Sequence, residues 1–203
     1  MQYIIIGLGN PGEEYKNTRH NTGRIVLEAF RKKNDFSGWE IDKKLKALSS
    51  EGVVRPLDGA RGKEKVLLVL PETFMNNSGK SVAPLVKTKK AAEKLVVVHD
   101  DLDIPLGAMK ISFNRGSGGH KGIESIKRAI KTEAFIRARI GISPATPSGK
   151  VKKPKGDKAV ADFILGKFKP KEIEALKKIS KKACDALGAI VSDGRERAMG
   201  EFN

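Results

Sequence analysis

The chain has 203 residues, 39% of them hydrophobic and 32% charged, which is typical of one globular α/β domain and excludes a disordered or fibrous protein. No run approaches the roughly 18 consecutive apolar residues of a membrane-spanning helix, so we expect a soluble protein. Lysine and arginine outnumber aspartate and glutamate by 40 to 24, and this excess favours a polyanion such as RNA or DNA as partner over a merely solvated surface.

Short β-rich runs alternate with helical patterns along the chain. The expected strands cover residues 3–6, 66–70, 95–98, 109–113 and 136–142, and the expected helices cover residues 21–33, 78–92, 119–131 and 171–191. Strands separated by helices predict a single α/β domain over residues 1–203, with a twisted mixed, largely parallel sheet covered by helices on both faces.

Two segments near the C-terminus differ in character from the rest. Residues 143–158 combine three prolines with five lysines, a pattern that predicts an irregular basic loop near the entrance to a site. Residues 171–191 repeat apolar side chains at helical spacing and predict a docked amphipathic helix. The lone Cys184 lies on that apolar stripe, where a core residue is favoured over a nucleophile. It cannot form an internal disulfide, which fits a cytoplasmic protein.

Polar residues that could carry chemistry gather in four segments, each close after an expected strand. The segments are residues 7–21, 71–79, 99–103 and 116–122, and all three histidines lie among them. Because the carboxyl ends of parallel strands open onto a common crevice, we expect the four segments to line one pocket.

Three other kinds of site fit these segments less well. The glycines at 7–12 match a dinucleotide-binding loop, but Pro11 removes a backbone N–H where the pyrophosphate should lie. The histidines with Asp100, Asp101 and Asp103 could ligate a metal, but neither HExxH, HxH nor a second cysteine strengthens that interpretation. A serine nucleophile would need a GxSxG elbow, which the sequence does not contain.

A water-activating pair of histidine and carboxylate fits best. A histidine can take a proton from water at neutral pH, and a carboxylate at its other ring nitrogen fixes the tautomer and stabilises the imidazolium. We therefore predict that His20 is the catalytic base and that Asp100 is its partner. The side-chain amides of Asn10 and Asn76 could donate to a carbonyl oxygen as it becomes negative, with a turn or helix N-cap as the alternative role for each.

The ordered motifs resemble those of the bacterial-type peptidyl-tRNA hydrolases. The resemblance begins with GLGNPG at 7–12, Tyr15 and TRHNTG at 18–23, and continues with TFMNNSGK at 73–80 and HDDLD at 99–103. It extends through GSGGHKG at 116–122, RIGI at 139–142 and FILGKF at 163–168. Each motif is weak alone, but the ordered set is specific.

The resemblance implies hydrolysis of the ester that joins a peptide to the terminal ribose of tRNA, without metal or cofactor. It assigns His20 as the general base and Asp100 as the carboxylate that orients it. Asn10 and Asn76 would hold the substrate near the reacting carbonyl. The further residues expected to bind the peptide are Tyr15, Met75, His120 and Lys121.

The partner implied by the resemblance is peptidyl-tRNA, bound through its acceptor stem and 3′ end. Arg139 matches a residue that helps to grip the terminal phosphate of the tRNA. Ser112 stands where a second basic residue is usual in the family, so Lys110 or Arg115 is expected to substitute. We further expect a cytoplasmic monomer with no obligate protein partner and no membrane association.

Lys121 stands where the family motif has Asn, and lysine offers three donors but no acceptor, so peptide contacts there are expected to differ. Two other functions stay open on the sequence alone. One is an RNA-binding relative that has lost catalysis, which a turnover assay would reveal. The other is a metal-dependent phosphoesterase built on the carboxylates of residues 100–103, which chelation would silence.

Overall fold

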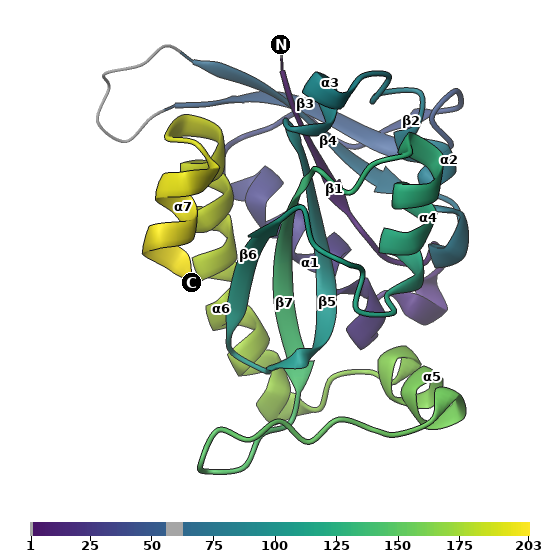
Figure 1. The fold of residues 1–203 in the computed structure, drawn as a ribbon, viewed down its shortest axis with the longest axis vertical. Helices are drawn as coiled ribbons and strands as arrows, with labels where there is room; N and C mark the ends of the chain where they lie inside the picture. Colours follow the sequence, from purple (N-terminus) through teal and green to yellow (C-terminus); the bar gives the residue numbers. More distant parts are fainter. Residues whose placement is uncertain (1, 56–62) are drawn as a thin grey trace.

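The fold is built around one sheet of seven strands in the order β2-β3-β4-β1-β5-β7-β6 (Figure 1). The computed structural model describes residues 2–55 and 63–203. The strands are β1 (Tyr3–Gly7), β2 (Glu40–Asp42), β3 (Ala47–Val54), β4 (Glu64–Pro71), β5 (Leu95–Pro105), β6 (Met109–Phe113) and β7 (Ile136–Ser143).

The four central strands are parallel and the outer ones are antiparallel. β1 pairs in parallel with β4 and β5, and β5 pairs in parallel with β7. β2, β3 and β6 add antiparallel pairs at the two edges. The predicted mixed sheet is therefore confirmed, with its parallel character confined to the centre, where both faces are covered by helices.

Helices cover the sheet on both faces. They are α1 (Thr22–Lys33), α2 (Gly79–Val82), α3 (Lys89–Ala92), α4 (Lys121–Ile130), α5 (Asp157–Leu165), α6 (Pro170–Ser192) and α7 (Arg195–Phe202). In β1, Ile5 packs in one apolar cluster with α1 and α6, whereas Ile4 and Ile6 pack in a second cluster with α2 and α4. This alternation follows from the two-residue period of a strand and explains why the run 3–6 is apolar throughout. Among the helices of the described ranges, none is both long and apolar enough to cross a membrane.

The helix predicted over 78–92 is wrong, because the chain there forms only the short helices α2 and α3. Ala83 caps the C-terminal end of α2, and Pro84 follows it. The ring nitrogen of Pro84 has no hydrogen and cannot donate the next backbone hydrogen bond of a helix. The basic loop predicted over 143–158 ends two residues early, because α5 begins at Asp157. The elements β2, β3, α5 and α7 were not predicted.

The close approach of α1 to the sheet brings the segment before it to the carboxyl ends of β1 and β5. Gly23, in the first turn of α1, allows this approach, because a Cβ atom there would lie 2.3 Å from the carbonyl oxygen of Val98 and 2.5 Å from the backbone nitrogen of Leu8. The preceding 3-10 turn, η2 (Arg19–Asn21), is thereby held beside the end of β5.

Candidate active site

A cavity of about 740 Å³ opens at the carboxyl ends of the central strands, as predicted. All four predicted segments contribute to its wall, and α5 with the end of the basic loop adds a further side. Residues from the four segments that line it include Asn10, His20, Phe74, Met75, Asn76, Asp100, Asp101, Asp103, Ser117, His120 and Lys121. Convergence of segments distant in the sequence is the arrangement that the strand ends predicted.

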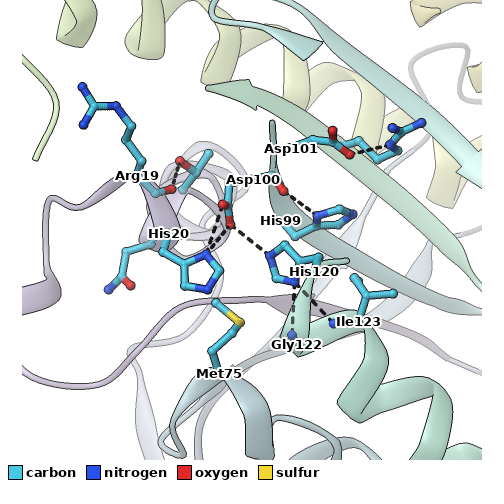
Figure 2. Close-up of polar contacts among 12 residues, drawn as sticks. Arg19, His20, Met75, His99, Asp100, Asp101, His120, Gly122 and Ile123 are labelled. Carbon is cyan, nitrogen blue, oxygen red and sulfur yellow. Dashed lines mark hydrogen bonds and ion pairs between the residues drawn. The ribbon is translucent and has the colours of Figure 1, made fainter. Parts of the chain in front are cut away.

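His20 and Asp100 form a buried hydrogen-bonded pair at the centre of the cavity (Figure 2). The Nδ1 atom of His20 lies 3.0 Å from Oδ1 and 3.1 Å from Oδ2 of Asp100. The His20 side chain is 8% exposed and that of Asp100 is 3% exposed. Because an ionised carboxylate only accepts, Nδ1 carries the proton and the lone pair of a neutral His20 lies on Nε2.

His120 donates a second hydrogen bond to the same carboxylate, a role that sequence analysis missed. Its Nε2 lies 3.1 Å from Oδ1 of Asp100. Its Nδ1 accepts from the backbone nitrogens of Gly122 at 3.1 Å and Ile123 at 3.4 Å, where it caps α4 (Figure 2). These two backbone donors require a lone pair on Nδ1, so the proton of neutral His120 must lie on Nε2.

The positions of the ring protons also decide whether these histidines could ligate a metal ion. His20, Asp100 and His120 form a group whose possible ligand atoms lie within 4.8 Å of one another. A metal ion needs a lone pair on each nitrogen that faces it, but in both histidines the nitrogen that faces Asp100 carries a proton. Moving the proton of His120 to Nδ1 would set it against two backbone N–H groups. The geometry therefore fits a carboxylate held by two N–H donors better than a metal centre.

Two ionisable groups in the cluster have strongly shifted pKa values. Burial alone would raise the pKa of Asp100, but the adjacent imidazoles of His20 and His120 outweigh it and hold the pKa well below its usual range. Burial, and next the neighbouring His120, lower the pKa of His99. His99 is therefore neutral; its Nδ1 donates to the carbonyl oxygen of Asp100 at 2.7 Å, and its ring lies 4.7 Å from that of His120. His99 does not line the cavity but contacts two residues that do, Asp100 and His120.

The carboxylates that follow Asp100 are each paired with a cation. Asp101 accepts from Nε of Arg139 at 2.7 Å, and Asp103 forms an ion pair with Lys153 of the basic loop. The three acidic side chains thus have three different kinds of partner, and this weakens the interpretation of residues 100–103 as a joint metal site.

Asn10 is oriented by its neighbours. Its Oδ1 accepts from the backbone nitrogen of Met75 at 2.8 Å, and its own backbone groups exchange two hydrogen bonds with the side-chain amide of Asn21, both at 2.9 Å. With Oδ1 so occupied, Nδ2 is the end of the Asn10 amide that can donate into the cavity. Asn76 is exposed and also lines the cavity, next to Met75, and its Oδ1 makes a long contact of 3.5 Å with Asn77.

The remaining predicted peptide-binding residues differ in their access to the cavity. Met75 is buried and lines it, and it packs closely on Gly122, where a Cβ atom would lie 2.5 Å from the sulfur of Met75. Lys121 is exposed and lines it as the first residue of α4. Tyr15 does not line it; its ring lies edge-on to that of Phe74 at 6.3 Å, behind the wall.

The predicted tRNA-binding residues lie outside the cavity, on and beside the β6–β7 edge of the sheet. Lys110 of β6 is exposed and directly opposite Arg139 of β7, so the two side chains share one face. Arg115 is exposed in the loop after β6. Sequence analysis missed the buried Arg137, which is opposite Ser112, whose own hydroxyl is buried and has no partner. Burial, and next Arg139, lower the pKa of Arg137.

Comparison with known proteins agrees with these features. A family model described as peptidyl-tRNA hydrolase matches residues 4–203 of the chain. The peptidyl-tRNA hydrolase of Alkaliphilus oremlandii (strain OhILAs) is 39% identical over 204 residues, which cover 99% of each chain. That of Aquifex aeolicus (strain VF5) is 38% identical over 201 residues, 97% of this chain and 93% of the relative.

The fold is also that of a solved relative. The crystal structure of peptidyl-tRNA hydrolase from Acinetobacter baumannii matches with a TM-score of 0.83 at 31% identity, covering 100% of this chain and 94% of that one. Sequence, fold and the convergence of the ordered motifs on one cavity lead to the same conclusion: the chain belongs to the peptidyl-tRNA hydrolase family.

Proposed function

We propose that the protein hydrolyses the ester between the peptide and the terminal ribose of peptidyl-tRNA, with His20 activating the attacking water. The observation that carries this proposal is the pairing of Nδ1 of His20 with Asp100, because it leaves the basic lone pair on Nε2 within a cavity. No metal or cofactor takes part in the proposed reaction.

The reaction proceeds in two steps. Nε2 of His20 takes a proton from water while the water oxygen bonds to the ester carbonyl carbon, which gives an oxyanion and an imidazolium. Nδ2 of Asn10 and the amide of Asn76 donate to this oxyanion. The bond from carbon to the ribose oxygen then breaks, and the ribose oxygen receives the proton from the imidazolium. The products are the free peptide and a tRNA with an intact terminal hydroxyl.

The peptide is proposed to lie along the wall formed by Met75, His120 and α5. Tyr15 acts indirectly, by holding the ring of Phe74 at 6.3 Å. Lys121 adds a cation at the first turn of α4, where it can donate to a peptide carbonyl or pair with an acidic side chain but cannot accept from a backbone N–H.

The tRNA is proposed to lie along the face that carries Lys110 and Arg139. Lys110 is the better candidate for the second cation, because it is directly opposite Arg139, whereas Arg115 lies on a loop. Asp101 holds the Arg139 guanidinium in place through Nε, which leaves the terminal nitrogens for phosphate oxygens. We propose that the protein acts as a monomer in the cytoplasm, since the cavity wall is formed within one chain and its substrate arises in translation.

Incubation with an N-blocked aminoacyl-tRNA, labelled separately in the amino acid and in the RNA, tests this function. We expect free N-blocked amino acid and tRNA of unchanged length. Release of nucleotides with the ester intact would instead identify a phosphoesterase, and stable binding without release would identify a non-catalytic RNA-binding protein.

Raising the salt concentration should weaken substrate binding steeply, because phosphate contacts release counterions. With about three such contacts, a fourfold increase in salt weakens binding by roughly 20-fold to 40-fold. Filter binding of intact substrate to a catalytically inactive variant measures this. The control is KM for an N-blocked aminoacyl ester of a nucleoside without phosphate, which should change little. A flat salt response for the tRNA substrate would contradict the proposed face.

A further inference from the structure

Helix α5 covers one side of the cavity, and its apolar packing on the main core is limited to the partly buried Phe163 and Ile164. Val160, Ala161, Ile164 and Leu165 line the cavity, and none of the residues of α5 is buried. The helix follows the basic loop, in which an isolated β-bridge pairs Ala145 with Val151 and the ion pair of Lys153 with Asp103 reaches the sheet. Elements with few buried contacts open at low free energy, so α5 needs another anchor to stay over a substrate.

The side chain of Arg19 provides that anchor. Its Nη1 donates to the carbonyl oxygen of Phe163 in the last turn of α5 at 3.3 Å, and its Cζ lies 4.4 Å from the centre of the Phe163 ring. A cation at the C-terminus of a helix and over an aromatic face is favourable on both counts. The side chain is only 7% exposed, so these contacts are shielded from solvent.

The other end of the Arg19 guanidinium is fixed to the body of the protein. Its Nη2 donates to Oε2 of Glu172 at 2.7 Å, and the same oxygen accepts from the backbone nitrogen of Lys169 at 2.6 Å, at the start of α6. The planar fork of arginine bridges α5 and α6 through two separate nitrogens, whereas a lysine would have to reach both acceptors from one nitrogen.

The backbone at Thr18 and Arg19 also pairs with the segment that directly follows α5. Its backbone nitrogen donates to the carbonyl oxygen of Gly166 at 3.0 Å, and Thr18 forms an isolated bridge with Lys167. A Cβ atom at Gly166 would lie 3.1 Å from Nη1 of Arg19. The hydrogen-bonded position of His20 is set separately, by Asp100. In Figure 2, Arg19 and His20 extend in opposite directions from the same turn.

We propose that Arg19 is a positioning residue that holds α5 over the bound peptide. The kinetic part of this inference rests on the proposed function; the structural part does not. Arg19 acts through α5 and does not itself touch the ester.

The variant Arg19→Lys keeps the charge but loses the fork. We expect KM for peptidyl-tRNA to rise about tenfold with kcat within about twofold, because α5 contacts the peptide whereas the His20–Asp100 pair is retained. Hydrogen–deuterium exchange should accelerate about tenfold or more at the amides of residues 158–166, with no change in β1 and β5. Glu172→Gln should change both quantities in the same direction by less.

Arg31→Lys is the matched control. Arg31 also pairs with a carboxylate, Glu28, donates to backbone carbonyls, and has its Cζ 5.9 Å from the centre of the Trp39 ring, but it lies outside the cavity. It should leave KM and exchange in α5 unchanged. Unchanged exchange in α5 of Arg19→Lys, or equal acceleration throughout the sheet, would overturn the inference. If the wild type releases no peptide while exchange in α5 alone accelerates, the function fails and the anchoring role stands.

Discussion

Replacing His20 with alanine is expected to lower the single-turnover rate of ester hydrolysis by about 10³-fold or more, within the range by which general bases contribute to catalysis. Binding of intact substrate should change by less than about twofold, because it depends mainly on dispersed phosphate contacts. Rapid-quench release of labelled amino acid measures the first quantity, and filter binding measures the second.

His20→Asn is the companion variant, because alanine leaves a small void beside Asp100. An asparagine amide can still donate to the Asp100 carboxylate, but it cannot take a proton from water at neutral pH. Both variants should therefore be equally inactive, and His20→Asn should melt closer to the wild type than His20→Ala does. Substantial turnover in His20→Asn would show that another group activates the water.

Asp100→Asn is expected to lower the rate by about 10²-fold to 10⁴-fold, as the loss of an orienting carboxylate does in other histidine-dependent hydrolases. The wild-type carboxylate accepts from both His20 and His120, whereas an asparagine has one acceptor oxygen and one donor group on that side. Both imidazoles donate to Oδ1, but only His20 also contacts Oδ2, so an amide NH2 group in the place of Oδ2 lies against the N–H of His20, while the tautomer of His120 is fixed by α4. The ring of His20 is therefore the one expected to turn or to change its tautomer.

The pH dependence of the wild type separates this role from a simple charge effect. Because the pKa of Asp100 lies well below its usual range, the carboxylate stays ionised as the pH falls through the range where an ordinary aspartate is protonated. In the folded enzyme the carboxylate is protonated only in stronger acid, whereas its contribution to stability is complete above the ordinary aspartate pKa and declines progressively from there down to the lowered pKa of the folded state. The deficit of Asp100→Asn relative to wild type should thus persist throughout the mildly acidic range. A deficit that vanishes near the ordinary aspartate pKa would contradict the assignment.

The pairing of His20 with Asp100 could be predicted from the sequence, because both follow strands whose carboxyl ends meet at one edge of a parallel sheet. The second donor to Asp100 could not. His120 is at the start of a helix, and only the hydrogen bonds from Gly122 and Ile123 show which of its nitrogens faces the carboxylate. The order of strands and loops is thus enough to predict that His20 and Asp100 meet. Which nitrogen of each histidine carries the proton depends on tertiary contacts that the sequence does not reveal.

The elements that the sequence failed to predict have local causes. β3 was missed because Ser49, Ser50 and Gly52 interrupt the alternation of apolar residues that marks a strand, and its stability comes from pairing with β4 along its length. α5 was missed because it follows a proline- and lysine-rich loop and buries none of its residues. Its anchor, Arg19, lies far away in the sequence and has no periodic signal.

The departures from the family pattern at Ser112 and Lys121 have different structural settings. The hydroxyl of Ser112 is buried and unpaired, and Ser112 is opposite Arg137. The exposed cation of β6 is Lys110, two residues earlier in the same strand. Lys121 lines the cavity directly. Any change in substrate preference should therefore be larger at the peptide end than at the tRNA end, while the His20–Asp100 pair is unaffected by either residue.

The measurement that tests the central claim most directly is single-turnover release of an N-blocked amino acid from its tRNA ester, with and without EDTA, in the presence of a polyamine that keeps the tRNA folded. Water activation by His20, held by Asp100, predicts the same rate in both conditions. Loss of release in EDTA that returns when a divalent metal is added back would contradict it.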